Sequence, residues 1–303
     1  MNRTVEPDDF RLVLFGYPFQ AFQDLVLVPH AQDRSQIQIA VDLEPSTVVL
    51  WLGSNDVLWA VIGANPLLVT PPEFFKLAFI TVLDRLTATE ATIVVGNVPD
   101  VSVIPFTRPA GEFLPPDLFA LLGITAEDRI TLPGIQVIGE ILAGNVSPPL
   151  GDHFVLTPNE AIEIQLAVDD YNAFISDQVA ALRSEGYPIA LADINSMLNF
   201  AETNGVVLAG RTLTTELLGG LFTLDGIHPT NTAHAIVANA FINVLNAEFN
   251  TGIRPLSVGQ VNKILHKDPL VFKNVGSPRG APGSHGKDVV RSLRFIGNPI
   301  MSP

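Results

Sequence analysis

The sequence predicts an α/β fold of three layers, αβα, in which helices cover both faces of a doubly wound parallel sheet. Two continuous β-branched runs, Ser46 to Leu52 and Thr92 to Val98, are predicted as strands that are buried on both faces. Ile189 to Asp193 is predicted as the next strand. Segments with apolar residues at helical spacing separate these runs, and such alternation is typical of a parallel sheet.

Three helices are predicted between and after these strands. Two of them begin with a Thr-x-x-Glu pattern and proline in the first turn, at Thr70 and at Thr157, which is typical of a capping box. The second of these helices is long, and Gly186 is placed to end it. The last helix is predicted to open near Thr230 or Asn231.

Composition indicates a folded chain. Hydrophobic residues make up 47% and charged residues 16% of 303 residues, which excludes a disordered composition. No apolar run approaches the roughly 18 residues that a spanning helix needs, so no transmembrane segment is expected. Met1 to Phe10 has no apolar core of a signal peptide, so the chain as written is expected to be soluble and cytoplasmic. The absence of cysteine excludes disulfides, thiolate catalysis and Cys-based metal sites.

Charge is distributed unevenly. The formal net charge is -14, yet residues 250–303 carry eight Lys/Arg against two Asp. An acidic body argues against nucleic acid as a partner of the main domain. The basic tail could bind a polyanion, but its low complexity predicts a solvated, disordered segment over 250–303.

The stretch of about residues 99–150 is rich in Pro and Gly and has little periodicity. We expect a loop-rich insertion over the mouth of the sheet. Its apolar side chains fit either a lining for lipid-like esters or simple packing of the loop. They are Phe106, Phe113, Leu114, Leu118 and Phe119.

The strongest chemical signal is Asp225 three residues before His228, in a segment that ends with Pro229. An Asp at this spacing can accept a hydrogen bond from the ring Nδ1–H, which leaves Nε2 free as a general base. Pro229 disfavours helix at His228 and keeps it in a loop. Taken alone, the pattern is as well explained by a loop His that is bonded locally.

A second signal, Gly53-Ser54-Asn55-Asp56, directly follows the first predicted strand. Ligands of a doubly wound sheet bind beyond the carboxyl ends of its strands, and an Asn amide there can donate to a developing oxyanion. The alternative is a strand-to-helix turn in which Asn55 or Asp56 caps the helix.

Taken together, the two signals resemble the GDSL-type, or SGNH superfamily, lipases and esterases. The segment Trp51 to Asp56 resembles their third conserved block, and Phe222 to Thr230 resembles the fifth. Shorter matches include Gly96 to Asp100 and the pair Tyr171-Asn172. The resemblance covers about residues 37–249, which we take as an SGNH hydrolase domain with the insertion at 99–150.

The resemblance implies a flavodoxin-like SGNH fold and hydrolysis of small esters through an acyl-enzyme. It implies that His228 deprotonates a nucleophilic serine, that Asp225 orients His228, and that Asn55 is an oxyanion donor. Gly53 and Asp56 would lie beside the site. No metal or organic cofactor is implied, and members of the family are usually exported, as periplasmic, secreted or lipid-anchored proteins.

The family's first two blocks are not recognisable. No Gly-Asp-Ser occurs, since the only Gly-Asp pair, Gly151-Asp152, precedes His153, and Gly16 does not match the second block. Residues 1–36 are therefore taken as a remnant, and the sheet is expected to lack its first strand, a place that Arg11 to Tyr17 could fill. A truncated gene model is the economical hypothesis, and the nucleophile stays unidentified.

Three functional hypotheses remain open at this point. The first is an ester hydrolase with a Ser/His/Asp mechanism, active when complete. The second is a non-catalytic relative that binds a ligand in the same cleft. The third is an inactive remnant that does not fold stably.

Overall fold

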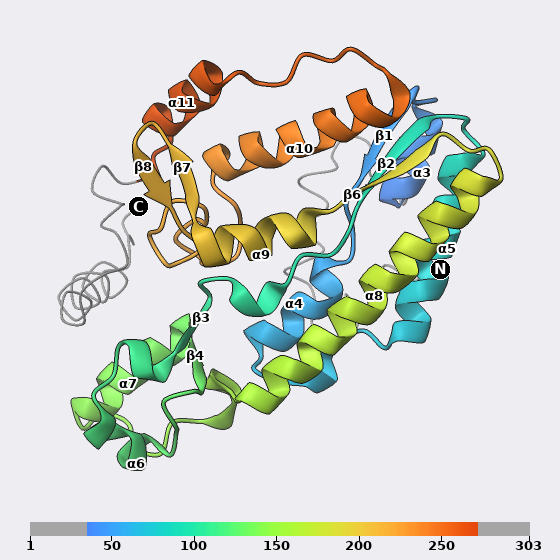
Figure 1. Cartoon of the computed structure of the whole chain (residues 1–303). Coiled ribbons are helices and arrows are strands. Elements are labelled where there is room, and N and C mark those ends of the chain that lie inside the picture. Colours follow the sequence, from blue (N-terminus) through green and yellow to red (C-terminus); the bar gives the residue numbers. More distant parts are fainter. Residues whose placement is uncertain (1–34, 272–303) are drawn as a thin grey trace, which may run out of the picture.

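The computed structural model describes residues 35–271, with a parallel sheet at the centre (Figure 1). Its strands lie in the order β1-β2-β6 and pair in parallel. They are β1 (Thr47–Leu50), β2 (Thr92–Gly96) and β6 (Ile189–Ala192). All but the first residue of β2 are buried, as expected for a strand covered on both faces. The predicted α/β class is confirmed.

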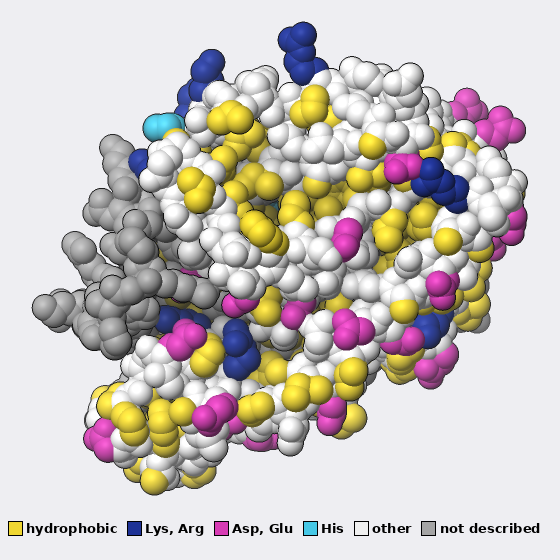
Figure 2. Space-filling view, viewed as in Figure 1, with side chains coloured by type: hydrophobic (Ala, Val, Ile, Leu, Met, Phe, Trp, Pro, Cys, Tyr) yellow, Lys and Arg dark blue, Asp and Glu magenta, His cyan; other side chains and the backbone are white. Residues whose placement is uncertain are grey.

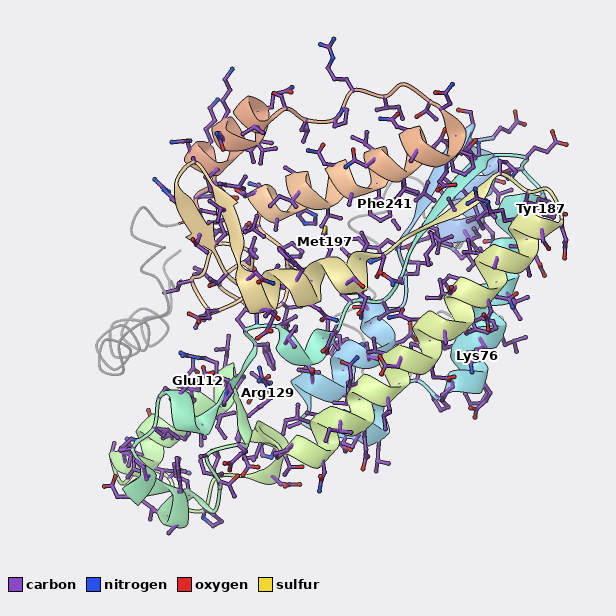
Figure 3. All side chains as sticks on the ribbon, viewed as in Figure 1. Lys76, Glu112, Arg129, Tyr187, Met197 and Phe241 are labelled. Atoms are coloured by element: carbon purple, nitrogen blue, oxygen red, sulfur yellow. The ribbon has the colours of Figure 1, made fainter. Side chains whose placement is uncertain are left out.

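Helices cover both faces of this sheet. Ile93 and Val95 of β2 belong to the core formed with α5 and α8, whereas Val94 packs on the opposite face with Phe241 of α10 (Figure 3). Because successive side chains of a strand point to opposite faces, β2 alone reveals the three layers. The helices around the sheet are α3 (Gln36–Asp42), α4 (Ser54–Ile62), α5 (Pro72–Thr87), α8 (Pro158–Ser184), α9 (Ile194–Asn204) and α10 (Asn231–Phe249).

One of the two predicted capping boxes is confirmed and the other is wrong. Thr157 caps α8, since its hydroxyl accepts from the Glu160 N–H and the Glu160 carboxylate accepts from the Thr157 N–H. Helix α5 has Pro71 as its N-cap and no side-chain cap. The backbone of Thr70 is committed elsewhere, because its carbonyl accepts the hydroxyl of Tyr171 from α8.

Strand β1 forms an edge of the sheet, because within residues 35–271 only β2 pairs with it. The side chain of Val49 in this strand is 50% exposed. The expectation that the sheet lacks a strand beside β1 depends on residues 1–34 and stays a prediction. Arg11 to Tyr17, the proposed replacement, and the rest of residues 1–34 lie outside the described part of the chain.

The insertion expected at 99–150 contains more regular structure than its sequence predicts. Three short antiparallel strands in the order β3-β4-β5 form a second sheet beside the main body (Figure 1). Strands of two or three residues show no period-2 pattern in a sequence, which explains the difference. The elements are β3 (Thr107–Pro109), α6 (Phe119–Leu122), β4 (Arg129–Thr131), α7 (Leu132–Leu142) and β5 (Val155–Leu156).

The apolar side chains of this insertion belong to the core. Phe106 is buried. The others are partly buried and packed against the core: Phe113, Leu114, Leu118 and Phe119. This arrangement favours loop packing over a lining for lipid-like esters.

A hairpin of β7 (Val206–Leu208) and β8 (Arg211–Leu213) precedes α10.

The ordered chain continues past the predicted boundary at residue 249, because α11 (Val258–Lys267) follows α10. The expected disorder from residue 250 is therefore wrong as far as residue 271. Helix α11 begins with a capping box, Ser257 with Gln260, and buries Val261 and Leu265, so its sequence carries a helix signal that the composition of residues 250–303 concealed. Residues 272–303 lie outside the described part.

One helical stretch, Pro66–Thr87, is long and apolar enough to cross a membrane by length and composition alone. Its Phe75 is buried and stacks on Tyr171 of α8, with ring centroids 3.9 Å apart. Core helices of soluble proteins pass the same test, so this stretch is weak support for a span. Figure 2 shows acidic side chains spread over the face in view, as expected from the net charge of -14.

Candidate active site at the carboxyl edge of the sheet

The segment Thr223 to His228 forms a tight turn just before α10. A bridge between Phe222 and Pro229 closes its base, and the Thr223 N–H donates to the His228 carbonyl at 2.8 Å. Gly226 within the turn has φ +71°, a left-handed conformation that favours glycine. The turn therefore holds Asp225 and His228 close together in a fixed loop.

Both carboxylate oxygens of Asp225 are used within this turn. Oδ2 lies 2.6 Å from Nδ1 of His228. Oδ1 accepts from the Thr223 hydroxyl at 2.5 Å, from the Ile227 N–H at 2.8 Å and from the His228 N–H at 3.0 Å. One oxygen thus organises the backbone while the other orients the ring, as the spacing of the two residues predicts.

The hydrogen bonds also set the charge of Asp225. Burial raises the pKa of this carboxyl, but the bonds from Thr223, His228 and Ile227 outweigh burial and lower the pKa to about 2. Asp225 is therefore ionised at neutral pH. A carboxylate accepts only, so we infer that Nδ1 of His228 carries the proton in this contact.

The other ring nitrogen of His228 is left to act as an acceptor. The side chain of His228 is 73% exposed. Within residues 35–271, no hydrogen bond joins Nε2 to a serine hydroxyl. The arrangement is an oriented imidazole whose basic nitrogen faces solvent, as a general base requires.

The turn is seated on the segment that follows β2. The Phe106 N–H donates to the Gly226 carbonyl at 3.0 Å. A Cβ at Gly226 would lie 2.7 Å from the Phe106 nitrogen and 3.0 Å from the carbonyl carbon of Pro105. Only glycine therefore allows this approach, which joins the Asp225 turn to the segment that follows β2.

The predicted Gly53–Asp56 motif lies at the carboxyl end of β1. Gly53 is the N-cap of α4 with φ 110°, and a Cβ there would lie 2.6 Å from a methyl carbon of Val98, just beyond β2. Asn55 is exposed in the first turn of α4, and Asp56 is partly buried beside it. The Gly53–Asp56 motif and the Asp225 turn therefore both lie beside the loop of residues 97–106, the motif at Val98 and the turn at Phe106.

A network of asparagines fixes that loop, and the sequence motifs predicted no role for it. Asn172 of α8 brackets Val98, since its side chain binds both the Val98 N–H and the Val98 carbonyl at 2.8 Å. The Asn97 amide donates to Asp193 at 2.8 Å, and the Asn195 N–H donates to Asn97 Oδ1 at 2.8 Å. The sequence signal was present, because Asn97 and Asn172 lie in the shorter matches quoted above.

Charge near the loop includes two ionisable groups with altered pKa values. Burial raises the pKa of Asp100, which lies in the loop, against the hydrogen bonds of Ser102. Burial lowers the pKa of Arg129 on β4, against the attraction of Glu112. Arg129 donates to the Thr107 hydroxyl at 2.9 Å and lines a polar cavity of about 90 Å³ between the insertion and the body (Figure 3).

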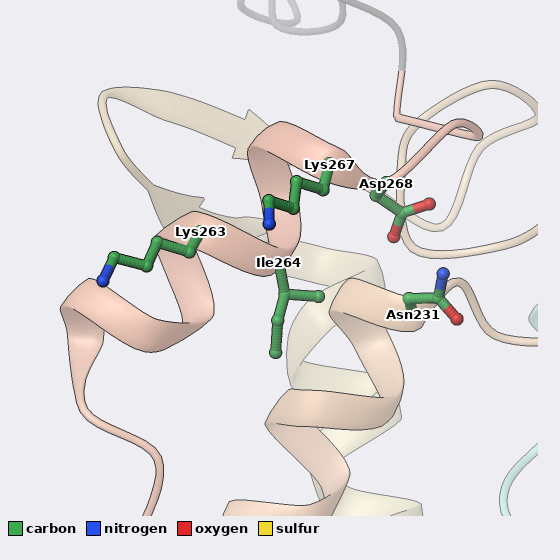
Figure 4. Close-up of a pocket in the computed structure, with 5 residues that line it drawn as sticks. All are labelled: Asn231, Lys263, Ile264, Lys267 and Asp268. Atoms are coloured by element: carbon green, nitrogen blue, oxygen red, sulfur yellow. The ribbon is translucent and has the colours of Figure 1, made fainter.

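No group of three or more His, Asp or Glu residues in the described part of the chain is arranged to hold a metal ion. A cavity of about 430 Å³ lies between α11 and the start of α10, where Asn231 and Asp268 are among the residues that line it (Figure 4). Its lining includes no acid–base pair of the kind found in the turn.

Comparison with known families identifies the chain. The family described as GDSL-like Lipase/Acylhydrolase matches residues 19–241, which span β1, β2, β6, the insertion and the Asp225 turn. A comparison with curated proteins gave no match. Because the match covers most of the sequence and agrees with the α/β fold, this chain belongs to the GDSL-like lipase/acylhydrolase family.

Proposed function

We propose that this chain is an ester hydrolase in which His228 is the general base and Asp225 its orienting partner. Ester hydrolysis is the general activity of the GDSL lipase/acylhydrolase family. The observation that carries the proposal is the 2.6 Å contact of Asp225 Oδ2 with Nδ1 of His228 in a turn that leaves Nε2 exposed.

In the proposed reaction, Nε2 of His228 takes the proton of a nucleophilic hydroxyl as that oxygen bonds to the ester carbon. The carbonyl π electrons move to oxygen and form the tetrahedral intermediate. Its collapse breaks the bond to the alcohol oxygen, which receives the proton from Nε2. Water, deprotonated by the same nitrogen, then attacks the acyl carbon. Collapse of the second tetrahedral intermediate breaks the bond to the enzyme oxygen, which takes the proton back from Nε2 and releases the acid. Asp225 stabilises the imidazolium in both steps.

Asn55 is proposed as one donor to the oxyanion. Its place in the first turn of α4 supports this role, because the N–H groups and partial positive charge of a helix start favour a developing negative charge. Gly53, at the start of that helix, would set how closely the turn approaches Val98 and the loop beyond β2.

The alternative function is ligand binding without turnover. The observation that favours it is that, within residues 35–271, no serine hydroxyl is bonded to Nε2 of His228. A serine outside this range that reaches Nε2 would supply the nucleophile of the ester hydrolase. If no serine reaches Nε2, the site could bind an ester but not hydrolyse it by this mechanism.

The test uses the purified 303-residue chain with p-nitrophenyl acetate and a fluorophosphonate probe. We expect turnover and labelling, both abolished by His228→Ala and both retained by His234→Ala, an exposed histidine of α10. Labelling that survives His228→Ala would contradict the assignment of the base. Absence of turnover, together with a rise in Tm on adding an ester, would favour the binding alternative.

A further inference from the structure

We propose that the segment Asp268–Val271, here called the C-terminal clamp, positions His228 by holding the base of the Thr223–His228 turn. The inference rests on the proposed role of His228 as the base. The clamp follows α11 and lies beyond residue 241, where the family match ends. Its residues reach both chain segments that enter and leave the turn.

Asp268 holds the segment that leaves the turn. Its Oδ2 accepts from both the N–H and the hydroxyl of Thr232, each at 2.8 Å. Thr232 lies in the first turn of α10 and is fully buried, and Asp268 is 6% exposed. Figure 4 shows the Asp268 carboxylate facing the start of α10. A carboxylate here satisfies free N–H groups of the helix start and is favoured by the helix dipole.

Val271 lies beside the segment that enters the turn. It is 6% exposed, and a Cβ placed on Gly220 would lie 3.4 Å from its Cγ1. The Gly220 carbonyl accepts the Thr230 hydroxyl at 2.9 Å, and the Leu221 carbonyl accepts the Thr230 N–H at 3.0 Å. The clamp thus contacts both sides of the base at which the two segments are joined.

The clamp is internally fixed. The Leu270 N–H donates to Oδ1 of Asp268 at 3.2 Å, and the Val271 N–H donates to the Asp268 carbonyl at 3.3 Å. One buried carboxylate therefore organises its own turn with one oxygen and the start of α10 with the other. Removing the Asp268 carboxylate leaves the buried N–H and hydroxyl of Thr232 without an acceptor. Thr232 lies two residues after Thr230, the N-cap of α10, which directly follows Pro229.

The geometry predicts a specific consequence for His228. The hydrogen bonds inside the turn do not fix where the turn lies relative to the edge of the sheet. That placement depends on the contact of Gly226 with Phe106 on one side and on the base held by the clamp on the other. The base also closes the turn itself, through the Phe222–Pro229 bridge and the bond from the Thr223 N–H to the His228 carbonyl. Loosening the base therefore opens the turn, so that the ring can leave Asp225 and the proton can reside on Nε2.

The experiment measures long-range 1H–15N correlations of the His228 ring, which report the nitrogen that carries the proton. Spectra of the full chain are compared for wild type, Asp268→Ala, Asp268→Asn and Thr232→Val, with His228→Ala for assignment. Ser257→Ala is the matched control, because it removes the cap of α11 at the end away from the clamp. Tm is recorded for every variant.

We expect the Nδ1–H form in wild type and Ser257→Ala, and a shift toward the Nε2–H form in Asp268→Ala and Thr232→Val. Asp268→Asn keeps an acceptor oxygen and should restore part of the wild-type spectrum. Where the chain turns over an ester, kcat should fall about tenfold to a hundredfold in Asp268→Ala with little change in KM.

Unchanged His228 spectra in the Asp268 and Thr232 variants would overturn the clamp. So would a Ser257→Ala variant whose His228 spectrum changes as much as that of Asp268→Ala when both lose the same Tm. An Asp268→Ala chain that does not fold leaves Thr232→Val and Asp268→Asn to decide. If wild type lacks esterase activity, the ring spectra still test the clamp, so failure of the proposed function and failure of the clamp are distinguishable.

Discussion

At the scale of a single residue, Asp225 has two tasks that one substitution can separate. Asp225→Asn keeps an oxygen for the Ile227 and His228 N–H groups but turns an amide N–H toward Nδ1 of His228. Nδ1 must then accept, so the proton moves to Nε2 and the base is lost. We expect kcat for ester hydrolysis to fall by about 10³- to 10⁴-fold, with Tm changed much less. Asp152→Asn, at an exposed site, should leave kcat unchanged.

Gly226 can be tested through its close backbone contact with Phe106. Gly226→Ala must place a Cβ 2.7 Å from the Phe106 nitrogen at φ +71°. Gly210→Ala is the matched control, because Gly210 has φ +75° with nothing within 4 Å of its Cβ position. Both variants bear a left-handed alanine, which costs about 1 kcal/mol, but only Gly226→Ala adds the clash. Urea unfolding should show a larger loss for Gly226→Ala, and equal losses would argue against a tight seat.

At the scale of the secondary-structure element, the start of α8 can be tested by its cap. Thr157→Ala removes the hydroxyl that accepts from the Glu160 N–H, and should cost about 1 kcal/mol of unfolding free energy. Thr157→Ser retains the hydroxyl and should recover most of that loss. The measurement is urea denaturation monitored by circular dichroism. A serine variant as unstable as the alanine variant would show that the methyl group, rather than the cap, matters.

Elements also show how far the sequence predicts this structure. The three central strands and α8 were predictable because long buried elements impose continuous or 3.6-residue apolar patterns, as at Ile164 and Val168. The short strands of the insertion were not, since they bury too few side chains to leave a period. Helix α11 has a capping box, Ser257 with Gln260, but the prediction for residues 250–303 rested on composition and missed it. Asp225 and His228 were found because their contact is local in sequence, whereas the contact of Gly226 with Phe106 joins distant segments and has no local signature.

At the scale of the whole molecule, the site depends on contacts between elements far apart in the chain. Asn172 of α8 holds the Val98 loop at the end of β2, and Gly53 at the end of β1 lies against the same Val98. Asn172→Ala would leave the Val98 N–H without its acceptor, whereas the Val98 carbonyl keeps the Asn195 amide at 2.9 Å, so the loss should be about 1–2 kcal/mol. Chemical denaturation measures this loss, and Asn199→Ala, on the exposed face of α9, should change stability little.

Acid stability of the whole molecule follows from carboxylates whose pKa values move in opposite directions. Hydrogen bonds lower the pKa of Asp225 to about 2 against the effect of burial, and those from Ser196 and Asn97 lower the pKa of Asp193 likewise. These groups stabilise the fold above their unfolded pKa near 3.8, and the contribution is lost as pH falls toward 2. Asp100 acts in the opposite sense, because burial raises its pKa and its ionisation on raising the pH is unfavourable to the fold.

We therefore expect Tm to fall between about pH 4 and pH 2 in wild type. The fall should be shallower in Asp225→Asn, which has no proton to take up there. Asp100→Asn should differ from wild type mainly above pH 3.8, where the raised pKa of Asp100 makes the wild-type fold more stable as the pH falls. The side chain of Asp225 is 46% exposed, so solvent screening keeps its share modest. Scanning calorimetry in matched buffers measures the three curves. Parallel curves for wild type and Asp225→Asn would mean that the bonds of Asp225 within its turn do not contribute to global stability, and that the contacts at the base of the turn maintain its order instead.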